Sequence, residues 1–404
     1  MNIYESRRAR NRSRQRKHIA LAAAFVFLLA IACGALYAHH NAGTEEAEPL
    51  AATSAERQAP QTLDEQADAI VREMTLTEKI GQMVMIGVHG TDVDENAQYM
   101  LRQFHIGGVI FFDRNLASAE QTKSFAEHLQ AYAQGEEAHQ KVPLFLAIDE
   151  EGGDVVRGAS FLPPPPSQAD IGRTGEPAQA GASAEKTARA LHALGINVNF
   201  APVADVGSPD RRSYASDAAT VSKFVSHAAD GYESEGMMYA LKHFPGIGKG
   251  RVDSHQAVST VDASRATLEN EDLVPFREMI QTRAPENFFV LVSHLIYPAL
   301  DPNHSASLSK AVMTDLLRGE LGYEGIIITD DMEMGAVANH APYRKLGVQA
   351  VKAGADIVLI CHEYQHEEDI YMGILEAVKA GDISEEQIDA SVRRIVKAKL
   401  AHGL

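Results

Sequence analysis

From Leu63 onward, short apolar runs alternate with longer amphipathic stretches. Apolar runs bounded by turn residues are typical of buried strands, whereas apolar residues repeating every three or four positions are typical of helices. The pattern predicts strands at Gln82–Val88, Gly108–Phe112, Leu144–Asp149, Asn197–Pro202, Met238–His243, Phe288–His294, Gly325–Asp330 and Asp356–Cys361. Helices are predicted between them, among others at Leu116–Gln134, Ala178–Leu194, Ser216–Glu235, Ala311–Leu321 and Pro342–Ala353.

This alternation predicts the fold class. Repeated strand–helix units imply parallel strands with the helices outside the sheet, and eight such units favour a closed barrel over an open sheet. Helix-start signals support the assignment, because Thr75 with Glu78 and Ser384 with Gln387 each match a capping box. We therefore predict one α/β domain, a single (β/α)₈ TIM barrel, over residues 62–404.

The first 38 residues follow a different pattern. Seven Arg and Lys residues against one acid, Glu5, precede an apolar stretch from Ile19 to about Ala38. A basic flank followed by an apolar core is typical of an export signal, and the stretch approaches the roughly 20 residues that span a bilayer. We predict that residues 1–38 are a signal peptide or membrane anchor. Cys33 follows Ala-Ile-Ala, which loosely resembles a bacterial lipoprotein site.

Residues 39–61 are rich in Ala, Glu, Pro, Thr and Ser, and we predict a disordered linker. The barrel is then expected in the cell envelope, either held at the membrane through residues 1–38 or secreted. We expect the protein to be a monomer.

Composition excludes several other functions. The formal net charge of −18 argues against a nucleic-acid partner, which would need a basic surface. No glycine-rich phosphate loop follows a predicted strand, and the histidines lack metal-ligand spacing, so we expect neither a cofactor nor a metal. The two cysteines, Cys33 and Cys361, are not expected to form a disulfide.

Charged residues gather where the predicted strands end, which is where (β/α)₈ barrels carry their chemistry. A single one of them could equally cap a helix or, like His294, be a core histidine, but four strands ending in this way indicate a site. The residues concerned are Asp149, Glu150, Glu151 and the loop residue Arg157 after strand three, Lys242 and His243 in strand five, Asp253 and His255 in the loop that follows, His294 after strand six, and Asp330 and Asp331 after strand seven.

These residue types suit sugar chemistry. A carboxylate can attack an anomeric carbon while a second group protonates the leaving oxygen. The second group is usually another carboxylic acid, but here the best-placed candidate is His255. Asp253, two residues earlier, can orient this imidazole and favour its protonated form.

At this point a family resemblance becomes visible. Lys242–Gly246 (KHFPG), followed by Asp253-Ser254-His255, resembles the signature of glycoside hydrolase family 3, in its β-N-acetylglucosaminidase (β-hexosaminidase) branch. The chain departs from the family at Ile247–Gly250, where a His-Gly-Asp run is usual. Further segments similar to the family are Ile148–Gly153 with Arg157, Arg212–Tyr214, His294–Asp301, and Gly325–Asp331 with Met334 and Gly335.

The resemblance implies residue roles. Asp330 would be the nucleophile that forms a covalent glycosyl-enzyme, and His255, partnered by Asp253, would be the general acid and then the base. The implied reaction is the retaining exo-hydrolysis of terminal β-linked N-acetylhexosamine, with peptidoglycan (muropeptide) fragments as the expected glycan. The residues implied to bind the sugar in the first subsite are Asp149, Arg157, Arg212, Lys242 and His243.

The position of the acid separates the branches. Family members that act on glucose or xylose generally take their acid from a second domain, whereas the acetylglucosaminidases carry it on the Asp-x-His loop. The predicted barrel reaches almost to Leu404, which leaves little sequence for a second domain.

Four alternatives stay open. A phosphorylase or a β-glucosidase would use much of the same site. A Schiff-base lyase would use Lys242 as its nucleophilic amine and leave Asp253, His255 and Asp330 without roles. A glycan-binding barrel without catalysis would have lost the nucleophile or the acid, and this sequence retains both.

Overall fold

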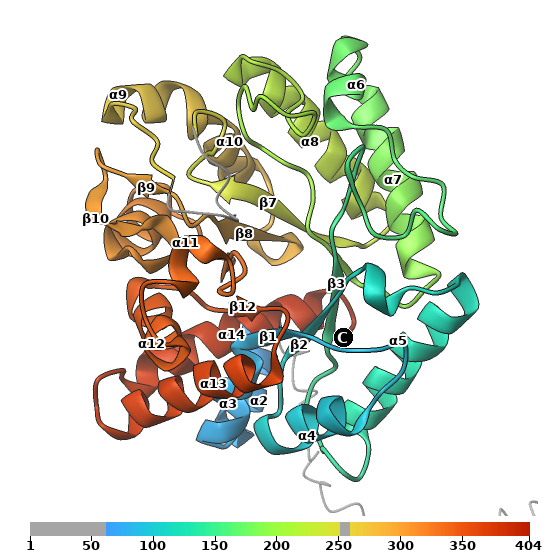
Figure 1. Cartoon of the computed structure of the whole chain (residues 1–404), viewed down its shortest axis with the longest axis vertical. Helices are drawn as coiled ribbons and strands as arrows, with labels where there is room; N and C mark the ends of the chain where they lie inside the picture. The colour runs from blue at the N-terminus through green and yellow to red at the C-terminus, as the bar shows by residue number, and fades with distance from the viewer. Residues whose placement is uncertain (1–61, 251–258) are drawn as a thin grey trace, which may run out of the picture. The chain divides into compact units, whose positions relative to one another are not determined.

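The computed structural model describes residues 62–250 and 259–404, and in these residues eight strands form one parallel sheet (Figure 1). The sheet order is β11-β8-β7-β6-β3-β2-β1-β12. All eight predicted strands are present; seven have shorter bounds than predicted, and β7 extends one residue further. They are β1 (Val84–Gly87), β2 (Gly108–Phe111), β3 (Phe145–Ile148), β6 (Val198–Asn199), β7 (Met238–Phe244), β8 (Phe288–Val292), β11 (Ile326–Thr329) and β12 (Val358–Ile360).

The sheet closes on itself between β11 and β12. β12 forms a regular parallel pair with β1, but it meets β11 through a single bridge between Ile328 and Ile357. Hydrogen bonds support that bridge, because Thr329 N donates to Ile357 O at 3.1 Å and Asp356 N donates to Ile327 O at 2.8 Å. The predicted (β/α)₈ barrel is therefore confirmed, with a seam between β11 and β12.

The helices surround the strands, as Figure 1 shows. Two helices, α2 (Leu63–Glu73) and α3 (Leu76–Gln82), precede β1, and α14 (Glu385–Ala401) follows the last barrel helix. The main helices after the eight strands are, in order, α4 (Glu95–Phe104), α5 (Ala119–Gln134), α7 (Ala178–His192), α8 (Ala218–Ser234), α10 (Val274–Thr282), the π-helix η5 (Ala311–Glu320), α12 (Tyr343–Ala353) and α13 (Tyr364–Lys379).

Shorter elements build the loops. Two hairpins lie after β3 and β8, formed by β4 (Glu150–Gly152) with β5 (Val155–Val156) and by β9 (Ile296–Tyr297) with β10 (Asp301–Ser305). The other short elements are α6 (Gln168–Arg173), α9 (Arg265–Thr267), α11 (Gly335–Ala338), the π-turn η2 (Leu268–Asp272), and the 3₁₀ turns η1 (Asp113–Asn115), η3 (Pro285–Asn287) and η4 (Ala306–Leu308).

Several sequence predictions fall outside the described residues. These are the signal or anchor segment 1–38 with Cys33, the linker 39–61, and the loop residues Asp253 and His255. Among the helices of residues 62–250 and 259–404, none is long and apolar enough to cross a membrane.

Both predicted capping sites start helices. Thr75 and Glu78 form the full reciprocal box at α3. At α14 the Ser384 Oγ accepts from Gln387 N at 3.2 Å, but the Gln387 side chain donates to Val351 O at 2.6 Å instead of returning to the cap. The predicted box at Ser384 is thus only half correct, because tertiary packing offers Gln387 a better acceptor.

Replacing Ser384 tests the remaining half of this cap. Ser384→Ala should lower the free energy of unfolding by about 1 kcal/mol, because Gln387 N loses its acceptor. Ser384→Asn, which restores a capping oxygen, should stay close to wild type. Urea denaturation of the three proteins measures the difference, and equal stability of the alanine and asparagine variants would contradict this role.

Candidate active site

A cavity of about 140 Å³ opens where the barrel strands end. Asp149 follows β3, and Asp330 follows β11. Lys242 and His243 lie near the end of β7. Together with Arg157 and Arg212, these are six of the eight residues predicted for the site, and all six line the cavity. The remaining lining residues are Glu151, Val155, Ile247, Ser293, Leu295 and Met334.

Lys242 and His243 both reach this cavity although they are neighbours in one strand. Consecutive strand residues normally point to opposite faces of the sheet. In β7 the pairing with β8 shifts between Leu241 and Phe244, which marks a bulge. Bulges re-aim side chains next to active sites, and here the usual alternation is broken between Lys242 and His243, which are joined by a cis peptide bond.

Lys242 is the buried cation at the centre of the site. Its Nζ lies 2.6 Å from Asp149 Oδ1 and 2.6 Å from Glu151 Oε1. Burial alone would lower the pKa of Lys242, but the two carboxylates outweigh it and raise the pKa above its usual value. The side chain is therefore an ammonium ion, which binds hydroxyl groups well and is a poor nucleophile. This charge state disfavours the Schiff-base alternative.

Glu151 is held by two cations, Lys242 and Arg212. Arg212 donates to it in a bidentate fashion, with both N–O distances at 2.8 Å. Burial would raise the pKa of Glu151, but Lys242 and Arg212 lower it to about 2. Sequence reasoning placed Glu151 in the loop after strand three but assigned it no role. Its position two residues beyond Asp149, inside the family-like segment Ile148–Gly153, was the available signal.

His243 is oriented by Asp205, which the sequence analysis missed. The His243 Nδ1 lies 2.8 Å from Asp205 Oδ2, and its Nε2 lies 3.1 Å from Arg212 Nη2. Because a guanidinium only donates, Nε2 accepts and Nδ1–H donates to Asp205. Asp205 Oδ1 also accepts from the backbone of Ile247 at 2.8 Å, so it fixes the start of the loop that leads to residues 251–258.

Asp330 is an ionised carboxylate in the cavity wall. Its backbone N donates to Val292 O at 2.9 Å, and its Oδ1 accepts from Asp331 N at 2.9 Å. Burial would raise the pKa of Asp330, but His294, His243, the hydrogen bond from Asp331 N and the charge of Lys242 together lower it below its usual value. The group thus has the charge that a nucleophile needs.

His294 is a fully buried residue with both ring nitrogens engaged. Nδ1 lies 2.6 Å from Ser307 Oγ, and Nε2 lies 2.8 Å from Asp331 O. These contacts hold the turn that carries Asp330, and His294 does not line the cavity. The core-histidine interpretation fits this residue better than a catalytic one.

Arg157 comes from the hairpin after β3. Its Nη2 lies 3.9 Å from Asp149 Oδ2, and its guanidinium lies over the Phe112 ring at 5.2 Å. Glu150 fixes this hairpin, because its Oε2 accepts from the backbone N of Arg157 at 2.8 Å and of Gly158 at 3.0 Å. The prolines at 163–166 follow as an irregular segment.

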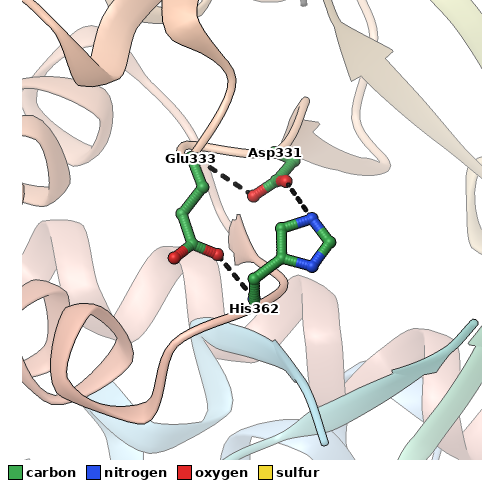
Figure 2. Close-up of side chains that lie close together, drawn as sticks. All are labelled: Asp331, Glu333 and His362. Carbon is green, nitrogen blue, oxygen red and sulfur yellow. Dashed lines mark hydrogen bonds and ion pairs between the residues drawn. The ribbon is translucent and has the colours of Figure 1, made fainter. Parts of the chain in front are cut away.

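A second polar group lies beside the cavity. In the described part of the chain, Asp331, Glu333 and His362 form the one group whose ligand atoms lie within metal-binding reach, all within 4.8 Å of one another (Figure 2). None of the three lines the cavity. The sequence analysis missed this group because His362 follows β12 whereas the two carboxylates follow β11. Residues this far apart in the sequence form no local pattern that would reveal their contact.

An α/β barrel with an ionised carboxylate and paired cations at its strand ends has groups that suit glycoside hydrolysis. The family model described as "Glycosyl hydrolase family 3 N terminal domain" matches residues 75–398. The chain belongs to glycosyl hydrolase family 3, which confirms the family predicted from the sequence.

Known proteins support the predicted branch. Beta-hexosaminidase A from Pseudoalteromonas piscicida is 35% identical over 332 residues, which are 74% of this chain and 54% of that protein. The beta-hexosaminidase of Alkalilimnicola ehrlichii is 36% identical over 292 residues, 69% of this chain and 80% of that protein. The chain thus spans about half the length of the first relative and most of the second.

A solved structure agrees with both. The family 3 beta-N-acetylglucosaminidase from Paenibacillus sp. str. FPU-7 superposes with a TM-score of 0.78 and is 38% identical, covering 82% of this chain and 63% of that chain. The β-N-acetylhexosaminidase class predicted from the sequence is supported by all three proteins.

The Glu151 carboxylate should make stability depend on pH. A carboxyl whose pKa is depressed on folding stabilises the fold above its unfolded pKa, and this contribution is lost as pH falls through the folded pKa. With values of 4.5 and about 2, roughly 3 kcal/mol should be lost over that window at about 1.4 kcal/mol per pH unit. Glu151→Gln should lack this pH dependence and be destabilised at neutral pH, because Lys242 and Arg212 lose their partner.

Urea unfolding at a series of pH values measures both effects. Glu185→Gln is the matched control, since Glu185 pairs with Arg189 at 2.6 Å on the exposed surface, where such a pair contributes less than about 1 kcal/mol. A Glu151→Gln protein that keeps the wild-type pH profile would refute the assignment.

Proposed function

We propose that the protein is a retaining exo-β-N-acetylhexosaminidase that hydrolyses terminal β-linked N-acetylhexosamine from glycans. The observation that carries the proposal is the ionised Asp330 in the same cavity as Lys242, Arg212 and Asp149. Carboxylates and cations in one cavity can bind several sugar hydroxyls while leaving one carboxylate to react. The similarity to β-hexosaminidases over most of the barrel supports the choice of sugar.

The proposed reaction has two steps. Asp330 Oδ attacks the anomeric carbon and forms a glycosyl ester, while His255 gives a proton to the leaving oxygen. His255 then takes a proton from water, the water attacks the same carbon, and Asp330 is released. Each step inverts the anomeric centre, so the product keeps the β configuration. The roles of His255 and its partner Asp253 come from the sequence alone.

The described residues have distinct tasks in this scheme. Sugar hydroxyls accept hydrogen bonds from Lys242, Arg157 and Arg212. Other sugar hydroxyls donate to Asp149. Glu151 holds Arg212 in place, and Asp205 holds His243. Both carboxylates are therefore occupied by protein partners. This division keeps the donors in place before the sugar arrives, which is the source of their catalytic value.

The first test uses 4-nitrophenyl N-acetyl-β-glucosaminide and the matching glucoside with the purified protein. We expect strong preference for the acetamido sugar, loss of activity in Asp330→Asn, and a smaller loss in His255→Ala, because nitrophenolate needs little acid assistance to leave. On an oligosaccharide the His255→Ala loss should reach roughly 10²–10⁴-fold. Proton NMR of the first product should show the β anomer.

Other outcomes identify the alternatives. Activity on the glucoside alone would make the protein a β-glucosidase, and a rate that depends on inorganic phosphate would make it a phosphorylase. Borohydride trapping of substrate on Lys242 would indicate a lyase. An α-anomer as first product would exclude retention, and binding without turnover of any glycan would leave a glycan-binding barrel.

We also propose that the glycan is a peptidoglycan fragment met outside the cytoplasmic membrane. The support is the basic and apolar pattern of residues 1–38, which predicts export and contact with the membrane. An exported N-acetylhexosaminidase meets cell-wall fragments as a source of terminal N-acetylglucosamine.

Substrates that share a terminal N-acetylglucosamine distinguish peptidoglycan fragments from chitin fragments. The kcat/KM for N-acetylglucosaminyl-N-acetylmuramyl peptides should exceed that for chitobiose. A preference for chitobiose would argue for chitin-derived substrates.

The location of the protein tests the export segment. The full chain should fractionate with the cell envelope, whereas a chain lacking residues 1–38 should not. An unchanged location of the shortened chain would argue against the predicted export segment.

A further inference from the structure

We propose that Asp331, Glu333 and His362 bind a divalent transition-metal ion such as Zn²⁺, at a site next to the sugar cavity but separate from it. The two carboxylates follow β11 and the imidazole follows β12, so the site lies across the seam of the barrel. Figure 2 shows the three side chains close together, with the His362 Nε2 directed at Asp331 and the Glu333 carboxylate directed at the His362 backbone.

The spacing of the ligand atoms suits a metal ion. His362 Nε2 and Asp331 Oδ2 are 3.3 Å apart. This is longer than the usual N–H···O range of about 2.7–3.2 Å. Four ligands held about 2.0–2.1 Å from a tetrahedral Zn²⁺ stand about 3.3 Å from one another. The three ligand atoms lie within 4.8 Å, so a small movement of one side chain completes the geometry.

The carboxylates are held in place by the surrounding backbone. Glu333 Oε2 accepts from the backbone N of Cys361 at 3.1 Å and of His362 at 2.5 Å, and Oε1 lies 2.6 Å from His366 Nδ1. Asp331 Oδ1 accepts from Glu333 N at 3.0 Å. Outer hydrogen bonds of this kind orient metal ligands and sustain their affinity.

A nearby buried carboxylate points independently to a cation. Glu367, in α13, is only 1% exposed, and neither of its side-chain oxygens has a hydrogen-bond partner among the described residues. It interacts electrostatically with Glu333, Asp331 and Arg114. The carboxyl group of Glu363 also acts on it, so acidic neighbours outnumber the single guanidinium. A buried carboxyl group without a hydrogen-bond partner is costly, and a cation beside it would supply that partner.

The donor set selects the kind of ion. One imidazole with carboxylates suits Zn²⁺ and related transition ions, whereas Mg²⁺ prefers oxygen ligands and retains its water. Arg114 opposes binding, because its Nη1 lies 3.1 Å from His362 Nδ1. Since Arg114 only donates, His362 Nδ1 accepts this hydrogen bond and the imidazole proton lies on Nε2. An ion bound to Nε2 would move the proton to Nδ1, where it faces the Arg114 guanidinium. Binding therefore costs the Arg114–His362 hydrogen bond.

An occupied site would act on the neighbouring nucleophile. Asp331 N donates to Asp330 Oδ1 at 2.9 Å, and the two residues share one turn. Pulling the Asp331 carboxylate toward an ion changes the backbone that places Asp330. We therefore expect Zn²⁺ to slow the proposed hydrolysis, a consequence that rests on the proposed function, whereas binding itself does not.

Calorimetric titration of the full chain with Zn²⁺ and with Mg²⁺ tests the site directly. We expect one Zn²⁺ per chain and no comparable Mg²⁺ binding. His362→Ala and Glu367→Gln should each weaken Zn²⁺ binding by roughly tenfold or more, and Arg114→Gln should tighten it, since a glutamine oxygen can accept from Nδ1–H. His304→Ala is the control, because His304 also pairs with an aspartate, Asp301, at 3.0 Å.

The outcomes are separable from those of the hydrolase assay. His362 has a side chain that is 45% exposed, so His362→Ala should fold, and circular dichroism verifies this. Zn²⁺ binding that is unchanged in both His362→Ala and Glu367→Gln would overturn the site, as would equal binding of Mg²⁺. Zn²⁺ binding by a protein inactive on every glycan would uphold the site and refute only the hydrolase.

Discussion

The active face depends on the buried charge of Lys242. An ammonium ion inside a barrel is tolerated only with anionic partners, and Asp149 and Glu151 supply them at 2.6 Å each. Glu151 in turn holds Arg212, and Arg212 lies against His243. One buried cation thereby ties together β7, the loop after β3 and the loop after β6. The groups proposed to bind the sugar are thus held in place by protein contacts.

The sequence predicted the barrel well because its strands are short, apolar and completely buried, as in Ile326–Thr329. It also predicted six cavity residues: five lie at strand ends or in the loops that follow, which share one face of a closed barrel, and the sixth, Arg212, came from the family resemblance. It did not reveal Asp205, which lies three residues beyond the end predicted for its strand and has no adjacent charge. Partnerships such as Glu151 with Arg212 depend on how two loops approach each other, and local pattern carries no such information.

The seam between β11 and β12 concentrates several unusual features. β11 pairs with β8 at four positions but with β12 at only one. Beyond the seam, the backbone bond from Met332 N to Leu359 O and the Glu333 side chain, which accepts from Cys361 N and His362 N, join the two sides. Asp330 follows the strand beside this seam. The position of the proposed nucleophile thus depends on loop contacts as much as on the sheet.

The matched charges of the cavity have a kinetic consequence. Asp149, Glu151 and Asp330 are balanced there by Arg157, Arg212 and Lys242, although the whole chain carries a formal charge of −18. Long-range fields accelerate encounters mainly with charged ligands, and added salt weakens such fields. An uncharged substrate such as a nitrophenyl glycoside gains nothing from electrostatic steering in a balanced cavity, so its rate of capture should vary little with ionic strength.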